Sequence, residues 1–247
     1  AAPDLAAYTG FDPNVNPGTS QEFSACAFRV GHTFLSERLL FHDGNGVVGS
    51  ESLVNLFFTP GSVRQNPLLI DLILIGQTIN PANEADTKVI PAVRDNLFGL
   101  PDAGVGRDLV VFNIMRGRDH GLPRYNDMRA GLGLTRKFNF NEVTRNPLIA
   151  AELSTAYGGD VNLCDPWICG LAEDAVGGGE LGELFSFVIA DQFQRYMDGD
   201  MFFYLNDPDV RDPSLISIGI DVDSITLADV INANTIGGVG PDAMLAQ

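Results

Sequence analysis

Lysine is almost absent from this chain of 247 residues. Lys88 and Lys137 stand against thirteen arginines, and Asp plus Glu outnumber Lys plus Arg by 32 to 15. The net charge of −17 would repel the phosphate backbone of a nucleic acid and an anionic membrane surface, so neither partner is expected. Arginine suits paired hydrogen bonds to carboxylates better than lysine does, so the few cations are expected to have specific roles.

Long apolar runs, glycosylation sequons and a disulfide framework are also missing. No run of 18 apolar residues occurs, so no membrane-spanning helix is predicted. The first residues lack the charged and apolar regions of a signal peptide, which is therefore expected to be absent or removed. Three cysteines are too few for a disulfide scaffold. Cys164 and Cys169 could pair across a tight turn, which would leave Cys26 as a lone, buried thiol.

The periodicity of the chain predicts a mainly α fold with long loops and little or no sheet. Residues 1–19 are rich in proline, asparagine and glycine and indicate an extended arm, while residues 20–247 are assigned to one domain. Ser20 is expected to cap a helix that continues with apolar residues at helical spacing to Leu35. A turn is predicted at 42–46, a short helix or strand at 52–58 and a loop at 99–106, with no convincing hairpin. Further helices are predicted at 66–75 (buried all round), 86–98, 124–132, 141–157 (two, divided near Pro147), 181–197 and 226–231. Residues 108–118 are also a helix candidate, although their Val-Val-Phe run could form a strand.

Two segments carry the residues best suited to chemistry. His32 follows Gly31 on a predicted helix. It is either a core residue with its hydrogen bonds made inside the protein, or a ligand, since the missing side chain of Gly31 would let a flat group approach the helix. In the second case, His32 would bind a metal, and Arg29, one turn away, would bind an anionic group. A haem offers both, because its iron can bind the histidine and its carboxylates can bind the arginine. The stretch Asn113–Asn126 concentrates three arginines after an apolar segment, so it needs anionic partners, either the chain's own carboxylates or those of a ligand.

The sequences of these segments resemble those of the animal-type haem peroxidases, the peroxidase–cyclooxygenase superfamily. The matching blocks follow the family's order over roughly residues 20–240, and the first is closer in form to the peroxidase branch than to the cyclooxygenase branch. The blocks are Arg29-Val-Gly-His-Thr33, Asn113-Ile-Met-Arg-Gly-Arg-Asp-His-Gly-Leu-Pro-Arg-Tyr-Asn126, Leu171-Ala-Glu-Asp174, Phe185 with Asp191-Gln-Phe193, and Arg195-Tyr-Met-Asp-Gly-Asp-Met-Phe-Phe-Tyr204.

The resemblance implies a set of roles around a haem b. His32 would be the proximal ligand of the iron, and Asn113 would accept a hydrogen bond from its other ring nitrogen, which orients the ring. Arg29 and Arg116 would lie near the haem propionates.

The resemblance also implies packing roles. Leu109 and Phe112 would pack on the proximal face of the macrocycle. Arg118, Asp119 and His120 are expected to hold the local backbone together, because a buried arginine–aspartate pair needs mutual satisfaction.

The distal side of such a site is not expected in this chain. Peroxide cleavage in the family uses a distal histidine and a distal arginine, yet the residues before His32 contain no histidine and Arg29 as their only arginine. The chain is therefore interpreted as the proximal, C-terminal half of the domain. A second chain or segment would carry the distal half, the calcium site and the acids that form covalent links to haem.

Three functions follow from the resemblance and stay open. The first is a secreted haem peroxidase in the response to oxidative stress, which uses hydrogen peroxide to oxidise a halide or a small aromatic donor. The second is a non-catalytic extracellular structural protein that keeps the half-fold as a scaffold. The third is a haem-dependent lipid dioxygenase, which would need a tyrosyl radical, and no motif marks any of the five tyrosines for that role.

Overall fold

The computed structural model describes residues 5–58, 61–97 and 107–240. The chain forms two compact units. The first comprises residues 1–34, 84–89 and 109–206, and the second comprises residues 35–83, 90–108 and 207–247. The predicted extent of one domain, residues 20–247, stays a prediction.

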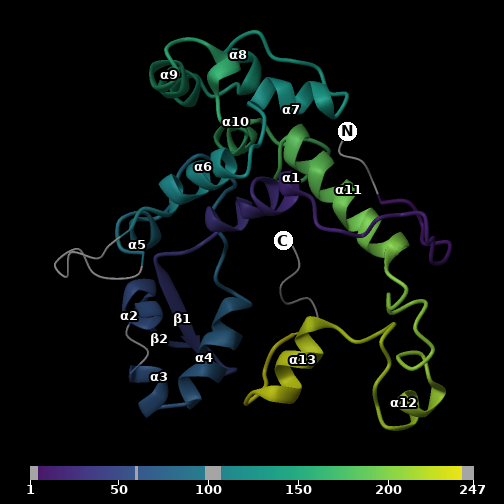
Figure 1. Cartoon of the computed structure of the whole chain (residues 1–247). Helices are drawn as coiled ribbons and strands as arrows, with labels where there is room; N and C mark the ends of the chain where they lie inside the picture. The colour runs from purple at the N-terminus through teal and green to yellow at the C-terminus, as the bar shows by residue number, and fades with distance from the viewer. Residues whose placement is uncertain (1–4, 59–60, 98–106, 241–247) are drawn as a thin grey trace. The chain divides into compact units, whose positions relative to one another are not determined.

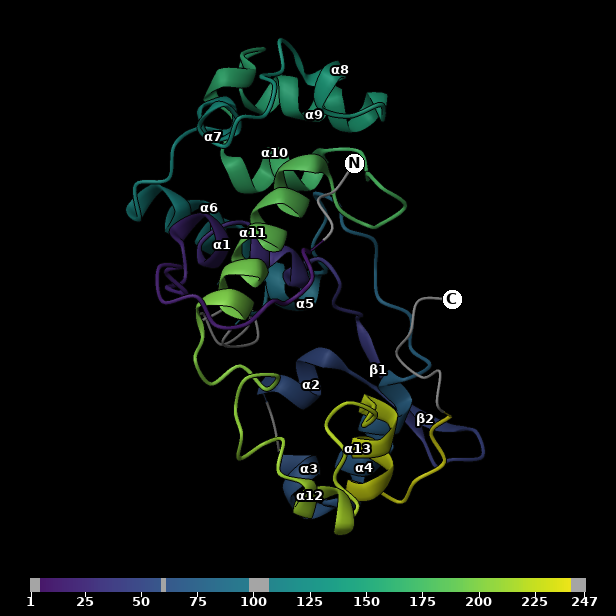
Figure 2. The same ribbon diagram turned by 90° about the vertical axis from the view of Figure 1, so that its right-hand side faces the viewer.

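The first unit is a helical assembly built around the long helix α11 (Figure 1). A short 3₁₀ helix, η1, packs against α10 and α11, and α10 also packs against α6 and α7 (Figure 2). The elements are α1 (Gln21–Ser24), η1 (Ala27–His32), α6 (Leu109–Asp119), α7 (Tyr125–Gly131), α8 (Phe140–Val143), α9 (Pro147–Ala156), the 3₁₀ helix η3 (Val161–Leu163), α10 (Pro166–Ala172) and α11 (Glu183–Gly199).

A glycine lets α10 and α11 approach closely. A Cβ on Gly170 would lie 2.2 Å from the ring of Phe185, and that ring is 1% exposed. Trp167 and Leu184 complete this interface as fully buried side chains. The close contact between α10 and α11 therefore depends on the missing side chain at position 170.

The N-terminal arm lies along α11. Residues 5–19 contain no helix or strand. The fully buried Gln192 of α11 accepts a hydrogen bond from the Ser20 backbone at 2.8 Å and donates one to the Gly18 carbonyl at 3.3 Å. These hydrogen bonds hold the arm against α11 just before the chain enters α1.

The helix predicted from Ser20 to Leu35 is shorter than expected. Ser20 caps α1 as predicted, since its side chain accepts from the Phe23 N–H. The α-helix ends after Ser24, and Cys26 takes a non-helical backbone conformation with φ −134° and ψ −90°. The chain continues as η1, and residues three apart eclipse each other in a 3₁₀ helix, so Arg29 and His32 share one side.

Asp165 joins the end of α6 to the start of α10. Its side chain is 4% exposed. It receives two hydrogen bonds from Arg118, at 2.9 and 2.6 Å, one from Arg124 at 2.7 Å and one from the Tyr157 hydroxyl at 3.1 Å. Burial opposes ionisation, but the hydrogen bonds from Arg118 and Tyr157 and the charges of the two arginines outweigh it and lower the pKa of Asp165. The predicted structural role of Arg118 agrees with these contacts.

A second buried ion cluster links α7 to α10 and α11. Arg129, with no exposed surface, donates to Glu173 at 2.5 Å and also to Glu183. The Tyr125 hydroxyl donates to the same Glu173 oxygen at 2.6 Å. Every charged group in this cluster has an opposite partner, which a buried charge requires.

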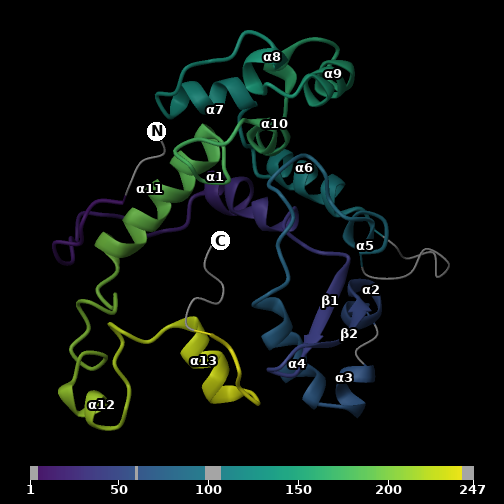
Figure 3. The same ribbon diagram turned by 180° about the vertical axis from the view of Figure 1, so that it is seen from behind.

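The second unit combines an antiparallel hairpin with short helices (Figure 3). Helix α4 packs against strand β1 so closely that a Cβ on Gly76 would lie 2.0 Å from the Leu40 carbonyl oxygen. Ile75 of α4 and residues of α13 form a small buried cluster. The elements are β1 (Arg38–His42), β2 (Val47–Ser52), α2 (Leu53–Phe58), α3 (Gly61–Gln65), α4 (Leu68–Gln77), α5 (Pro91–Arg94), α12 (Pro213–Ser217) and α13 (Leu227–Asn234).

Three predictions for the second unit are wrong. The hairpin β1–β2 was not expected, although its connecting turn at 42–46 was, and there Asp43 accepts from the backbone N–H groups of Asn45 and Gly46 at 2.8 and 3.0 Å. The helix predicted at 86–98 shrinks to Pro91–Arg94, because the residue before a proline disfavours the α conformation and Ile90 is extended, with ψ 146°. Helix α4 exists but buries only Ile75 and Gly76, so it is not enclosed all round.

Several other predictions agree with the structure. Helices α6, α7, α8, α9, α11 and α13 lie where they were expected. The pairing of Cys164 with Cys169, which the sequence left open, is a disulfide, and Cys26 is a buried free thiol. The mainly α class with little sheet is confirmed. The loop predicted at 99–106 lies outside the described residues. Within the described ranges, no helix combines the length and apolarity needed to cross a bilayer.

Replacing Gly170 tests the close packing of α10 against α11. Gly170→Ala is expected to lower the free energy of unfolding by about 1–3 kcal/mol, because the buried Phe185 ring cannot move aside freely. Gly131→Ala in α7 is the control, since a Cβ there meets no atom within 4 Å and alanine favours a helix. Chemical denaturation measures both. Equal stability of the two variants would contradict the packing.

Asp165 should make stability depend on pH in one direction. Its pKa is lowered on folding, so its stabilising effect is present above the pKa of an unfolded aspartate and is lost as the pH falls through the folded value. Asp165→Asn should cost about 2 kcal/mol at neutral pH, and the difference from the wild type should shrink in acid. Asp127→Asn, which removes an exposed ion pair with Arg136, should have little effect at either pH. A pH-independent difference would contradict the role given to Asp165.

Candidate functional site

His32, Asn113 and Arg29 form a connected polar group between η1 and α6. Asn113 is completely buried, and its Nδ2 lies 2.9 Å from Nδ1 of His32. Arg29 donates from Nη1 to the Oδ1 of Asn113 at 2.8 Å and from Nε to the Ser24 carbonyl at 3.0 Å. The structure therefore brings together three of the residues predicted for the site, although 84 positions separate Arg29 from Asn113.

The Asn113 amide faces the opposite way to the sequence-based expectation. The expectation was that Oδ1 would accept a hydrogen bond from the His32 ring, but the amide nitrogen faces the ring instead. The reason is Arg29, because a guanidinium only donates hydrogen bonds and so requires an oxygen opposite it. Sequence reasoning assigned Arg29 to a ligand alone and missed its contact with Asn113. No sequence signal was available, because the contact depends on the tertiary approach of η1 to α6.

The surroundings of His32 favour the neutral form of its ring. Burial lowers the pKa of His32, the nearby charge of Arg29 lowers it further, and the hydrogen bond with Asn113 opposes both effects. A neutral imidazole has one ring nitrogen with a free lone pair, as a metal ligand needs.

Arg29 lies next to His32, and Arg116 lies near Arg29; neither has an acidic partner among the described residues. In the described part of the chain, neither Arg29 nor Arg116 forms an ion pair, although the chain carries 32 acidic residues. Burial lowers the pKa of Arg29 and the charge of Arg116 lowers it further. Two neighbouring guanidiniums without a counter-charge form a site for an anionic group, and carboxylates match their geometry.

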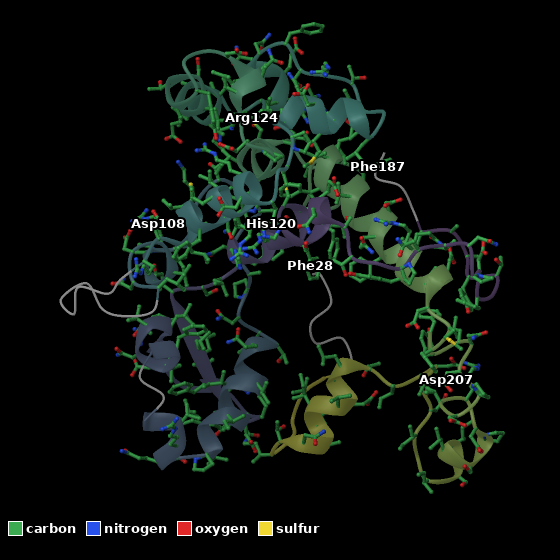
Figure 4. The ribbon with its side chains drawn as sticks, in the orientation of Figure 1. Phe28, Asp108, His120, Arg124, Phe187 and Asp207 are labelled. Carbon is green, nitrogen blue, oxygen red and sulfur yellow. A yellow bond between two sulfur atoms is a disulfide. The ribbon has the colours of Figure 1, made fainter. Side chains whose placement is uncertain are left out.

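His120 supports Arg116. Its Nε2 lies 3.4 Å from Nη1 of Arg116, and its Nδ1 lies 2.6 Å from Oε1 of Gln21. Figure 4 shows His120 where the end of α6 approaches α1. The sequence-based role of His120 in holding the local backbone agrees with this contact.

Apolar surface surrounds the polar group. Phe112 on α6 is 42% exposed and Phe28 on η1 is 55% exposed, and Phe28 stacks on the buried Phe23 at 4.5 Å between ring centroids. Leu109 is half-buried. A Cβ on Gly31 would meet no atom within 4 Å, so the surface next to His32 is open. Phe28 was not singled out from the sequence.

The residues present fit a haem. The structure combines a histidine held through Nδ1, two guanidiniums that form no ion pair within the described residues, and exposed apolar side chains on the same two elements. Among the described residues, no cluster of three or more His, Cys, Asp and Glu side chains could bind a metal ion by itself. One feature does not match. If His32 bound a metal through Nε2, its Nδ1 would carry the proton and would need an acceptor, whereas the amide nitrogen of Asn113 faces it here.

Comparisons with known proteins match this chain along most of its length. The family model for the animal haem peroxidases matches residues 2–243. Peroxinectin A of Dictyostelium discoideum is 34% identical over 238 residues, which are 95% of this chain and 43% of the relative. Chorion peroxidase of Drosophila melanogaster is 31% identical over 91% of this chain and 27% of its own length.

Solved structures show the same fold. Peroxidase A from Dictyostelium discoideum superposes with a TM-score of 0.82 at 32% identity, covering 96% of this chain and 44% of that protein. The fatty acid alpha-dioxygenase of Oryza sativa reaches a TM-score of 0.70 at 19% identity over 87% of this chain and 37% of that protein, which shows a shared fold alone. The chain thus spans less than half the length of these relatives. The family model and the sequence identity together show that this chain belongs to the animal haem peroxidase family.

Proposed function

We propose that this chain forms the proximal side of a haem-dependent peroxidase, with His32 as the axial ligand of the iron. The observation that carries the proposal is His32, which contacts Asn113 and whose pKa is lowered, near Arg29 and Arg116, neither of which forms an ion pair within the described residues. A bound haem b would supply the iron centre at which hydrogen peroxide is reduced and a donor is oxidised.

Different residues of the chain would bind the iron and the carboxylates of the haem. His32 would give its Nε2 lone pair to the iron, while Asn113 fixes the plane of the ring from the other side. Arg29 and Arg116 would hold the two carboxylates through charge-assisted hydrogen bonds.

Apolar contacts would complete the binding surface. Leu109 and Phe112 would pack on the macrocycle, and the exposed surface of Phe112 is available for that contact. The open surface beside Gly31 would let a flat ring approach the histidine.

The reaction needs groups that this chain does not supply. A distal histidine moves the proton between the peroxide oxygens and a distal arginine stabilises the departing oxygen. The residues before His32 contain no histidine, and Arg29 is already placed on the His32 side. We assign the distal pair, the calcium site and the covalent links to haem to a second chain or segment, which agrees with relatives more than twice as long.

The proposed setting is extracellular, with a halide or a small aromatic molecule as the donor. The Cys164–Cys169 disulfide supports this setting, because such bonds persist in oxidising compartments. Two alternatives remain testable. A lipid dioxygenase would need a tyrosyl radical, and a scaffold protein would bind no haem.

Haem binding is the first test. Titration of the chain with haemin is expected to produce a Soret band at a one-to-one ratio, and His32→Ala should abolish the ligation or shift the band to that of a weakly bound haem. His42→Ala is the matched control, because His42 ends strand β1 and its Nδ1 accepts a hydrogen bond from the Gly44 backbone N–H, away from the His32 group. A colourless, folded wild-type chain would favour the scaffold alternative.

Activity is the second test. The chain loaded with haem should show little peroxidase turnover of a small aromatic donor with hydrogen peroxide. Addition of a second chain or segment that carries the distal histidine and arginine should raise the turnover by at least about 100-fold, since general acid–base catalysis contributes that much. Full turnover by the chain alone would contradict the assignment of the distal pair to another segment. Oxygen uptake with a fatty acid in place of peroxide would favour the dioxygenase.

A further inference from the structure

The 3₁₀ helix η1 has an open apolar side next to the side that carries His32. Residues three apart eclipse each other in a 3₁₀ helix, so Ala27 and Val30 share one side, and both are buried. Phe28 and Gly31 share another side. Phe28 is 55% exposed, and a Cβ on Gly31 would meet no atom within 4 Å. The described part of the chain therefore leaves this side of η1 open.

Helix α11 continues the open apolar surface. One side of the helix is buried and includes Phe185 and Val188. Residues four apart also lie on one side of an α-helix, and Ile189, Phe193 and Met197 have this spacing. Phe193 is 40% exposed, and the other two side chains are half-buried. A helix that is apolar on more than one side is normally covered on each of them, so this second side of α11 is expected to have a partner.

Aromatic rings join the two open sides into one surface within the first unit. Phe28 stacks on the buried Phe23 with 4.5 Å between ring centroids, and Phe193 approaches both rings edge to face, at 6.0 and 5.8 Å. Single exposed apolar side chains are ordinary on a monomer, whereas a contiguous group marks a contact site. We call this group the docking face. It consists of Phe28, Gly31, Ile189, Phe193 and Met197.

The charge of the chain and the length of its relatives indicate what covers the docking face. A second copy is disfavoured, because each copy carries a net charge of −17 and the two would repel. The chain covers 43% of peroxinectin A and 44% of Peroxidase A, so more than half of each relative lies outside the match. The distal groups would lie beyond a haem bound to His32. The segment that carries them is therefore the one that the site brings to the neighbouring side of η1.

We propose that the docking face binds the segment that carries the distal histidine and arginine, and that this segment contributes an apolar helix face. Phe28 and Phe193 are the anchors, because buried aromatic side chains contribute most of the binding energy at an interface. Gly31 has no side chain, which lets a neighbouring backbone come close. The inference rests on the proposed function for the identity of the occupant, but the open face itself does not depend on haem.

Photochemical cross-linking in the cells that make the protein tests the docking. The photoreactive amino acid p-benzoylphenylalanine replaces Phe193, and mass spectrometry identifies the peptide that it captures. The expected peptide lies outside these 247 residues, in a haem peroxidase segment that contains the distal histidine and arginine. The same amino acid in place of Phe138 is the control and should not capture that segment, because Phe138 is 84% exposed but belongs to neither η1 nor α11.

Variants show whether the docking face makes the contact. Phe28→Asp places a charge at an anchor and should lower the yield of the cross-link from position 193 by at least about tenfold. That variant also loses the stacking on Phe23, so a second one is needed. Gly31→Trp adds bulk where a Cβ meets no atom, so the chain should fold normally and still lose the cross-link. Phe138→Asp is the matched control and should keep the wild-type yield, and thermal unfolding checks the fold of all three.

Each outcome decides the proposal. A cross-link to a second copy of this chain, or to a protein without the distal pair, would overturn the proposed occupant. A yield no higher than that from position 138, or one that Gly31→Trp leaves unchanged, would overturn the docking face.

Haemin titration separates this inference from the proposed function. If no Soret band forms but the His32→Ala chain still captures the expected segment, the docking stands and the ligation of iron by His32 fails. If the Soret band forms but the cross-link leads to a second copy, the haem function stands and the docking of the distal segment fails.

Discussion

The guanidinium of Arg29 donates hydrogen bonds and accepts none, and the geometry around His32 depends on that property. The guanidinium therefore faces Oδ1 of Asn113 at 2.8 Å, and the amide nitrogen of Asn113 points to His32 instead. Because Asn113 is completely buried, water does not compete for either end of its side chain. A charge at the edge of the site thus acts on the far side of the histidine through one rigid amide.

The arginines of the chain divide according to whether they have acidic partners. Arg118 and Arg124 share Asp165, and Arg129 lies between Glu173 and Glu183, so these side chains hold helices together. A chain with a net charge of −17 has ample carboxylates for every arginine. An arginine near His32 without an ion pair among the described residues is therefore a better indication of an anion-binding site than the arginine content of the chain.

Sequence patterns predicted the types of site residue but not their relations. Capping residues and helical spacing were sufficient for α6 and α11, whose apolar faces repeat regularly. They failed at Cys26, where a buried backbone kink changes an α-helix into a 3₁₀ helix, and at β1 and β2, whose strands show no clean alternation of burial. The motif predicted that Asn113 would touch His32. It did not predict the amide orientation, because a third residue distant in sequence decides it.

The 3₁₀ form of η1 has a consequence for the site that the predicted α-helix would not have had. In an α-helix, residues three apart are offset by about 60° around the axis, whereas in a 3₁₀ helix they eclipse. Arg29 and His32 are separated by three residues, so the observed form lets both reach the single side chain of Asn113. The break at Cys26 is therefore a local departure from helical propensity that brings Arg29 and His32 to the same side of η1. It also explains why a single asparagine is sufficient to connect the charge that would hold a carboxylate with the ring that would hold the iron.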